Sequence, residues 1–225
     1  MNKKTFTRIL FYLLSIVILA LGITLNTKTE LGVSPIISTA FSVSTIKDYN
    51  FGNATLVLYT LLIVVEVFIH IFVKNPHAII ADILQFPLSL FFTRVLNLCG
   101  YFIPKLHTDL GDTWMGSYSG RIFFLAIAII LTGVGAALSM DMRIIPNPGD
   151  GIVQTISDAC GKGPGLVKNC VDVTCVCFTL IISYIFAGRI IGIGIGTILA
   201  MIFVGRVIAA FNGLCKKKLD EMTGL

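Results

Sequence analysis

The sequence predicts an all-α, polytopic membrane protein with six transmembrane helices in two inverted three-helix repeats, joined by short broken or amphipathic segments. Hydrophobic residues make up 56% of the 225 residues and charged residues only 13%, whereas soluble domains average about 25% charged residues. The mean hydropathy is +0.91. A helix needs about 20 mainly apolar residues to cross a bilayer core. The runs of this kind are 6–25, 54–73, 78–98, 121–139, 166–187 and 190–211.

The first run has the position of a signal peptide but not its composition. Its apolar part is longer than the hydrophobic region of a signal peptide, and no A-x-A cleavage site follows it. We therefore expect residues 6–25 to form a spanning helix. We also expect residues 1–225 to form a single membrane domain.

The distribution of lysine and arginine predicts which side of the membrane holds the termini. An even number of spans puts both termini on one side, and loops rich in Lys and Arg stay in the cytoplasm. Ten basic residues flank the spans on the side of the termini and five on the other side, so we expect both termini to be cytoplasmic. The first set is Lys3, Lys4, Arg8, Lys74, Arg143, Lys162, Lys168, Lys216, Lys217 and Lys218, and the second is Lys28, Lys47, Lys105, Arg121 and Arg189.

The chain resembles itself weakly at a shift of 112 residues, which places 91–96 on 203–208. Internal similarity of this kind indicates a repeated structural unit. We expect a first repeat over residues 6–103 and a second over 121–215, each with three spans. Because three is an odd number, the second repeat must lie in the opposite orientation, as in secondary transporters built from inverted repeats.

Each half contains a polar break after its first span. Proline fixes φ and removes a backbone donor, glycine permits positive φ, and Asp150 is expected to be a helix N-cap. A helix-like segment follows each break, at 36–44 and 152–160. A break at membrane depth must be buried in protein or line a wet cavity, which predicts a solute site; the alternative is an ordinary loop with an interfacial helix. The break residues are Gly32, Ser34, Pro35, Pro148, Gly149 and Gly151.

Polar residues inside two predicted spans are candidates for a solute or ion site. Ionisable groups inside a membrane cost roughly 2.5–3.5 kcal/mol or more, so they usually face the protein interior. Glu66 and His70 share one helix face, which suits a proton relay or a cation site; the alternative is an interior Glu66 paired with an arginine. Asp82, Gln85 and Ser89 share a face of the next helix, which suits a cavity wall or polar helix packing.

Four further charged residues complete the candidate set. Arg94 and Arg206 hold equivalent repeat positions and would form a fork for a carboxylate or phosphate, or pair with acidic residues, or reach the interface. Asp172 follows Lys168 by one helical turn, which favours a structural pair. Asp150 would help hold a cation, whereas the N–H groups at the start of its helix would favour an anion.

No motif predicts catalysis, a cofactor or a metal site. The sequence contains no H-E-x-x-H, G-x-S-x-G or Walker A motif, and its three histidines are scattered. The glycines of 192–197 lie in an apolar run without the preceding strand of a nucleotide fingerprint, so we expect them to allow close helix packing. The six cysteines lack metal-binding spacing and are interpreted as apolar packing residues. We expect neither an enzyme nor a nucleic-acid-binding protein.

Three glycine-containing motifs stand out along the chain. They are Gly32-Val33-Ser34-Pro35, Pro148-Gly149-Asp150-Gly151 and Gly192-Ile193-Gly194-Ile195-Gly196-Thr197. Together they resemble the YczE/YyaS/YitT-like family of bacterial integral membrane proteins, over nearly the whole chain. The resemblance implies a small multi-pass protein of the bacterial inner (cytoplasmic) membrane and supplies no activity, substrate or catalytic residue. The chain departs from that family at Pro146, an extra proline, and at Asp172, where members often carry glutamate.

These observations favour a secondary transporter that carries a small polar or charged solute by alternating access. Glu66 would couple the transport to protons. The alternatives are a substrate-capture subunit of a larger importer and a non-transporting membrane accessory or scaffold protein. The expected partners are the lipid bilayer, a small-molecule or ion solute, and either further copies of the chain or a larger transport complex.

Overall fold

The structure, a computed structural model, describes residues 3–225 and is all-helical over that range. Six helices are long and apolar enough to cross a membrane, which confirms the predicted number of spans. They are α1 (Lys3–Lys28), α3 (Phe51–Phe72), α4 (Pro76–Phe102), α5 (Tyr118–Asp141), α7 (Pro164–Ala187) and α8 (Ile195–Thr223). Two shorter helices, α2 (Pro35–Ile46) and α6 (Pro148–Cys160), follow the two predicted breaks, and a 3-10 turn, η1 (Trp114–Gly116), precedes α5.

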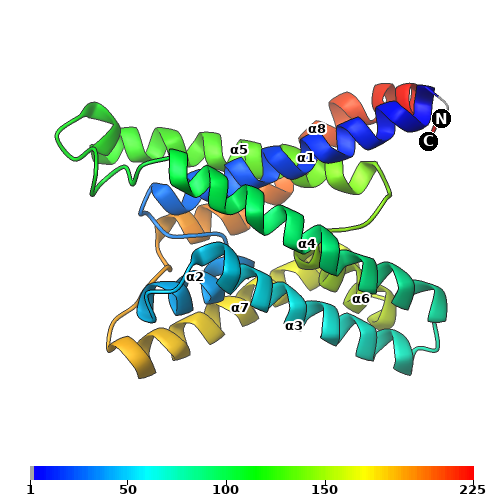
Figure 1. Cartoon of the computed structure of the whole chain (residues 1–225), viewed down its shortest axis with the longest axis horizontal. Coiled ribbons are helices and arrows are strands. Elements are labelled where there is room, and N and C mark those ends of the chain that lie inside the picture. The colour runs from blue at the N-terminus through cyan, green and yellow to red at the C-terminus, as the bar shows by residue number, and fades with distance from the viewer. Residues whose placement is uncertain (1–2) are drawn as a thin grey trace.

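The helices form two layers, with α4 crossing between them (Figure 1). α1, α5 and α8 pack together in the upper layer of this view, and α2, α3, α6 and α7 pack in the lower layer. α4 packs on both α1 and α3. Both termini lie at one end of the molecule, and α2 and α6 begin near its centre and run to opposite ends.

The second half repeats the element order of the first half in the opposite direction. In Figure 1, α1 runs antiparallel to α5, α3 to α7 and α4 to α8. Most helix contacts follow the same correspondence, because α2 packs on α7 as α6 packs on α3, and α1 packs on α4 as α5 packs on α8. The exception is the last span of each half, since α4 packs extensively on α3 whereas α8 barely contacts α7. The order of elements and their packing therefore agree with two inverted halves.

Single residues around the breaks match at an offset of 113, one more than the sequence comparison predicted. Ser34 and Asn147 are the N-caps of α2 and α6, and each is followed by proline. Glu30 and Arg143 lie just after α1 and α5, and both have positive φ, 55° and 48°. The predicted shift of 112 came from matches inside the long helices, 11–13 on 123–125 and 91–96 on 203–208, and it misses the residues around the breaks by one position.

Prolines and side-chain caps begin most of the helices. α2, α4, α6 and α7 each have proline in the first turn, where the missing N–H has no partner to lose. The side chains of Asn50 and Ser117 accept hydrogen bonds from the backbone N–H groups of Asn53 and Gly120 at the starts of α3 and α5. These caps satisfy donors that a helix end leaves open.

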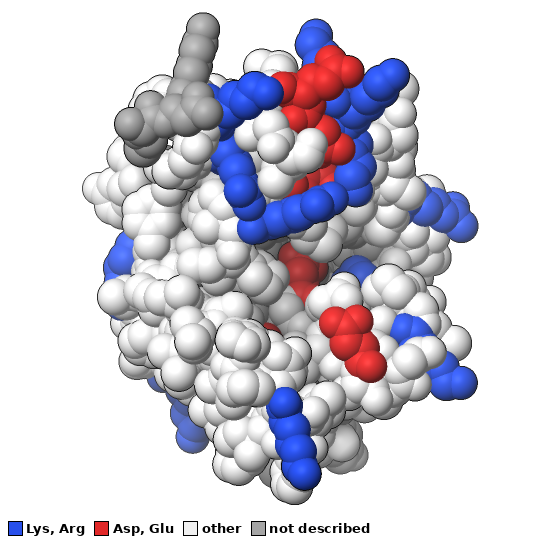
Figure 2. Space-filling view, turned by 90° about the vertical axis from the view of Figure 1, so that its right-hand side faces the viewer, with Lys and Arg blue, Asp and Glu red and all other residues white. Residues whose placement is uncertain are grey.

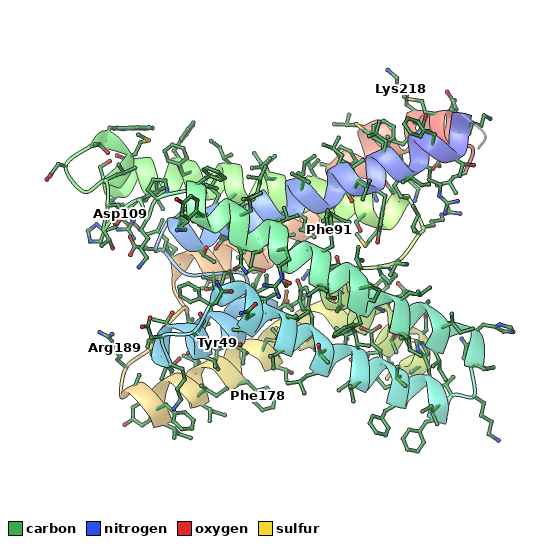
Figure 3. All side chains as sticks on the ribbon, in the orientation of Figure 1. Tyr49, Phe91, Asp109, Phe178, Arg189 and Lys218 are labelled. Carbon is green, nitrogen blue, oxygen red and sulfur yellow. The ribbon has the colours of Figure 1, made fainter. Side chains whose placement is uncertain are left out.

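Large apolar side chains cover the outside of the long helices. Phe91 on α4 is 47% exposed and Phe178 on α7 is 57% exposed, and Phe178 points away from the molecule (Figure 3). Exposed apolar surface of this extent is expected where helices face lipid. The charged residues Lys218 and Arg189 mark opposite ends of the molecule in the same view.

The last span differs from its prediction at both ends. The expected helix covered residues 190–211, whereas α8 covers Ile195–Thr223. Gly192 has a φ of 83°, and its carbonyl accepts a hydrogen bond from the Val33 N–H of the first break over 2.9 Å. Gly192 and Gly194 therefore lie in the segment before α8, and the prediction that they pack inside a spanning helix was wrong.

Candidate functional site

α2 and α6 meet at their N-terminal ends in the centre of the molecule. A Cβ added at Gly149, in the first turn of α6, would lie 3.4 Å from Ile36, in the first turn of α2. A small cavity of about 50 Å³ lies between these two turns. Its polar lining residues are Ser34, Tyr59, Thr132, Asn147, Asp150 and Lys168. The two predicted breaks thus border one central cavity.

Asn147, and not Asp150, caps α6. The Asn147 side chain accepts a hydrogen bond from the Gly149 N–H over 3.3 Å. Asp150 lies in the first turn of the helix, since α6 begins at Pro148. The predicted capping role of Asp150 was wrong, which leaves its carboxylate available to the cavities.

A larger polar cavity, which we call the vestibule, opens at the end of the molecule that carries the termini. Its volume is about 380 Å³, and its walls come from α3, α4, the end of α5, α6 and the turn before α6. Figure 2 shows this end, with a hollow at its centre and acidic side chains in and beside the hollow. Asp150 lines both the vestibule and the central cavity and so lies between them. The charged lining residues are Glu66, His70, Asp82, Arg143, Asp150 and Asp158.

Glu66 and Gln85 form the deep wall of the vestibule. Both side chains are fully buried, and Gln85 Nε2 donates to Glu66 Oε2 over 2.7 Å. The other two oxygens, Glu66 Oε1 and Gln85 Oε1, have no hydrogen-bond partner among the described residues. A Cβ added at Gly151 would lie 2.9–3.0 Å from both Glu66 oxygens and from Gln85 Nε2. Glycine at this break position therefore lets α6 approach the two side chains.

The side chains of His70 and Asp82 are hydrogen-bonded beside Glu66. His70 Nδ1 lies 2.6 Å from Asp82 Oδ2, and the side chains are 13% and 4% exposed. The Asp82 carboxyl group is also close enough to interact with that of Glu66. Asp82, Gln85 and Ser89 are all buried on one face of α4, as the sequence predicted. Three ionisable side chains, His70, Asp82 and Glu66, therefore lie next to one another in the wall of the vestibule.

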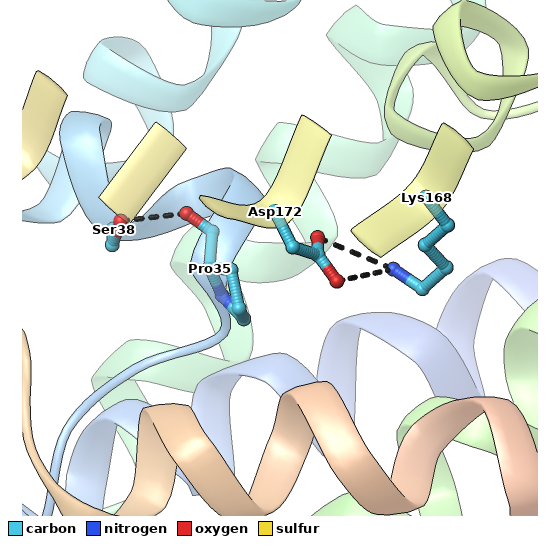
Figure 4. A network of polar contacts seen from close by, with 4 residues as sticks. All are labelled: Pro35, Ser38, Lys168 and Asp172. Carbon is cyan, nitrogen blue, oxygen red and sulfur yellow. Dashed lines mark hydrogen bonds and ion pairs between the residues drawn. The ribbon is translucent and has the colours of Figure 1, made fainter. Parts of the chain in front are cut away.

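Lys168 and Asp172 form the ion pair that their spacing predicted. Lys168 Nζ lies 3.1 Å from Asp172 Oδ2, and the two side chains are 25% and 1% exposed. Figure 4 shows this pair on α7 beside Pro35 and Ser38 of α2. Lys168 also borders the central cavity and interacts electrostatically with Asp150. The Lys168 ammonium group thus interacts with the carboxylates of both Asp172 and Asp150, next to the breaks.

Arg94 and Arg206 are not brought together by the fold. Arg94 Nη1 donates to Asn53 Oδ1 over 3.0 Å at an exposed position. The Arg206 guanidinium lies over the Phe203 ring, 5.4 Å from its centroid. Neither arginine lines the vestibule or the central cavity. The structure therefore forms no fork from these residues, because both point outward from their helices.

A row of buried hydroxyl groups, which we call the hydroxyl seam, closes the interface of α2 and α7. Ser38 Oγ lies 2.7 Å from Thr179 Oγ1, and Ser42 Oγ lies 2.7 Å from Ser183 Oγ. All four side chains are buried. Each hydroxyl satisfies another, so this interface is closed by paired polar groups.

The hydroxyl seam occupies the place in the second half that Glu66 occupies in the first. At the offset of 113, Thr179 corresponds to Glu66, and Ser183 corresponds to His70. The seam was not predicted from the sequence, although Thr179 and Ser183 repeat the spacing of Glu66 and His70. The equivalent interfaces therefore differ: the α3–α6 interface is acidic and borders an open cavity, and the α2–α7 interface is neutral and closed.

The opposite end of the molecule carries a cavity of about 460 Å³ between the first break and the segment before α8, and this cavity shares no lining residue with the central cavity. Backbone contacts join these two segments. The Val33 N–H of the first break donates a hydrogen bond to the Gly192 carbonyl. The Gly196 N–H, in the first turn of α8, donates to the Leu31 carbonyl over 2.8 Å. A Cβ added at Gly32, whose φ is 113°, would lie only 2.6 Å from Gly194 N. A side chain at Gly32 would therefore force these two segments apart.

The vestibule offers hydrogen-bond acceptors and carboxylates to a ligand. The described residues contain no group of three His, Cys, Asp or Glu side chains that would hold a metal ion. A buried carboxylate without a cationic partner is costly unless a proton or another cation neutralises it. The arrangement can therefore take up a proton or bind a cationic group at Glu66.

Comparison with known proteins identifies a family for this chain. Neither the curated proteins nor the solved structures yield a significant match to the chain. One family, described as "Family of unknown function (DUF6198)", matches residues 6–213. Since this match covers most of the sequence, the chain belongs to the DUF6198 family.

Proposed function

We propose that this protein is a secondary transporter that moves a small polar or charged solute across a membrane by alternating access. One observation carries the proposal. The vestibule opens at one end and leads to Glu66 and the central cavity, while the equivalent interface of the other half is closed by the hydroxyl seam. The cavity at the opposite end shares no lining residue with the central cavity. Access to a central site from one end and not from the other is the arrangement expected of a transporter with inverted repeats.

The pseudo-symmetry supplies the second conformation. In that conformation α2 and α7 would separate and expose the hydroxyl seam, while α3 and α6 would close over Glu66. The backbone contact of Val33 with Gly192 would open at the same time. The central cavity borders both breaks, so it would face each side of the membrane in turn.

Glu66 is proposed to couple solute movement to protons. Its carboxyl group is fully buried, and His70 is already paired with Asp82. Closure of α6 would remove the polar vestibule that borders this buried charge. Such closure is favourable only when a proton or a cationic solute neutralises the carboxylate.

The proposed location is the inner membrane of a bacterium, with both termini in the cytoplasm. The excess of lysine and arginine on the side of the termini supports this orientation. With this orientation, the vestibule of the present conformation opens to the cytoplasm. Glycosylation or protease mapping of tags at the two ends would test the orientation directly.

Transport is tested in proteoliposomes that contain a pH-sensitive dye. Amines, amino acids, organic anions and vitamins are added in turn, and proton movement is recorded with wild type, with Glu66→Gln and with the exposed control Glu221→Gln. We expect one solute class to drive proton movement in wild type and in Glu221→Gln but not in Glu66→Gln. Absence of solute-driven flux across the whole set, or full activity of Glu66→Gln, contradicts the proposal and favours an accessory protein.

A further inference from the structure

We propose that the vestibule binds a small primary ammonium ion, the protonated form of an amine, through Glu66 Oε1 and Gln85 Oε1. The inference deepens the proposed function by naming a substrate class, and it rests on that function only for the step of transport. The proposed binding itself follows from buried polar atoms that have no hydrogen-bond partner among the described residues. Three properties of the vestibule carry it: its free acceptors, its charge, and its lack of aromatic side chains.

The open groups at the deep wall are both acceptors. Gln85 Nε2 donates to Glu66 Oε2, and this contact fixes the orientation of the Gln85 amide. Its oxygen and Glu66 Oε1 are then left buried and without a partner among the described residues. A buried polar atom that lacks a hydrogen bond costs free energy. The group that satisfies both atoms must therefore supply N–H or O–H donors, which a simple anion such as acetate lacks.

The charge of the vestibule selects a cation. Four carboxylates line it, two on the spanning helices and two on α6, against one arginine and one histidine. Neither of these basic residues neutralises Glu66, because His70 is hydrogen-bonded to Asp82 and Arg143 is exposed at the rim. Glu66 therefore has no cationic partner among the described residues. The positive end of the α6 dipole alone would favour an anion, but Asp150 in the first turn and Glu66 against Gly151 offset it.

The shape of the vestibule favours a primary ammonium over a quaternary one. Its volume of about 380 Å³ lies within the range of small-molecule sites. Quaternary ammonium groups are held by the faces of aromatic rings, and no Phe, Tyr or Trp is among the described residues that line this cavity. A primary ammonium instead offers three N–H donors, which match Glu66 Oε1 and Gln85 Oε1 and leave one for water or Asp82.

Gly151 is proposed to set the width of this site. A methyl group there would lie 2.9–3.0 Å from the Glu66 oxygens and from Gln85 Nε2, so Gly151→Ala must push both side chains away from α6. Because those contacts are the ends of flexible side chains, the helix itself can remain in place. The variant therefore disturbs the acceptor pair while the carboxylate charge is kept.

Binding is tested with the purified full-length chain in detergent by thermal unfolding at constant ionic strength. The probes are ammonium, propylammonium, butane-1,4-diammonium, tetramethylammonium, sodium and acetate. We expect the primary ammonium ions to raise the unfolding temperature in a saturable manner, and tetramethylammonium, sodium and acetate to leave it unchanged. Glu66→Gln and Gly151→Ala should weaken binding of propylammonium at least about tenfold, whereas Glu221→Gln and Gly165→Ala should not change it.

The possible outcomes separate this inference from the transporter proposal. Stabilisation by sodium alone would make the site a metal-cation site, and stabilisation by acetate would make it an anion site; either overturns the inference, as does no response to any probe. Saturable binding of primary ammonium that depends on Glu66, without flux in proteoliposomes, supports the inference and contradicts transport. Flux of another solute that propylammonium does not inhibit supports transport and contradicts the inference.

Discussion

Arg8 and Arg121 make the same contact in the two halves of the molecule. Arg8 on α1 donates from Nε and Nη2 to the carbonyls of Met142 and Arg143, over 2.7 Å each. Arg121 on α5 donates from the same two atoms to the carbonyls of Thr29 and Glu30, over 2.7 and 2.8 Å. Each arginine thus holds the backbone that leaves the first helix of the other half.

Loss of either arginine should destabilise the protein by a similar amount. The carbonyls at a helix C-terminus lack intrahelical partners and carry partial negative charge, which a guanidinium fork satisfies. We expect Arg8→Ala and Arg121→Ala each to lower the free energy of unfolding by roughly 1–3 kcal/mol, measured as detergent thermal stability. Lysine at either position keeps the charge but not the fork and should restore only part of the loss. A large effect at one position and none at the other would contradict the equivalence of the two halves.

Hydropathy and helical periodicity predicted the parts of this fold that depend on local sequence. They gave the number of spans, the two short helices, and the buried face of Asp82, Gln85 and Ser89. They did not predict the start of α8, because Gly192 leaves the helical conformation in order to bond with Val33, which is distant in sequence. Whether the chain shares the structure of YczE/YyaS/YitT-like proteins stays a prediction.

The sequence predicted which polar residues line the vestibule, but it did not predict where the two arginines point. Glu66, Asp82, Gln85 and Asp150 all line the vestibule, since an ionisable side chain inside a membrane must turn toward protein or water. Arg94 and Arg206 avoid lipid in another way. They lie on the outer faces of long helices, where a long side chain can reach the water interface. Position in the sequence gives the depth of a residue in the membrane but not the neighbour that it faces.

Removing Lys168 should be more damaging than removing the charge of Asp172. Lys168→Met would leave the Asp172 carboxylate buried, 1% exposed, without its partner, which costs on the order of 2–3 kcal/mol when one charge of a largely buried pair is lost. Asp172→Asn would leave an ammonium group that is still partly solvated and close to Asp150, so its cost should be smaller. Thermal unfolding of both variants checks the order. If Asp172→Asn is the less stable protein, the unpaired ammonium group costs more than the unpaired carboxylate, and the prediction is wrong.

Glu30 should make the loop of residues 103–117 sensitive to acid. Partial burial raises the pKa of Glu30, but hydrogen bonds from the Thr108 hydroxyl and from the Thr108 and His107 N–H groups outweigh this effect and hold the pKa below its usual value. A group whose pKa is lower in the folded state stabilises it above the unfolded pKa, and this stabilisation is lost as the pH falls through the folded pKa. The loop should therefore detach at a pH below the ordinary glutamate range.

Trp114 provides the measurement, because it is the single tryptophan of the chain and belongs to η1 in this loop. Its fluorescence should change in an acid titration of wild type, and Glu30→Gln should show the low-pH signal at all pH values. Asp112→Asn, an exposed acid of the same loop, serves as the control and should titrate like wild type. A titration that Glu30→Gln leaves unaltered would assign the transition to another group.

A disulfide across the hydroxyl seam should arrest transport reversibly. Ser42 and Ser183 face one another with 2.7 Å between their oxygens, so cysteines at both positions, in a background without the six natural cysteines, are placed to form a bond. Oxidation would prevent α2 and α7 from separating, and solute-driven flux should fall to background and return on reduction. The vestibule lies on the other side of the site, so propylammonium binding in detergent should survive oxidation. The single variants Ser42→Cys and Ser183→Cys control for the substitutions themselves. Flux that continues in the oxidised protein would mean that the seam does not open during transport.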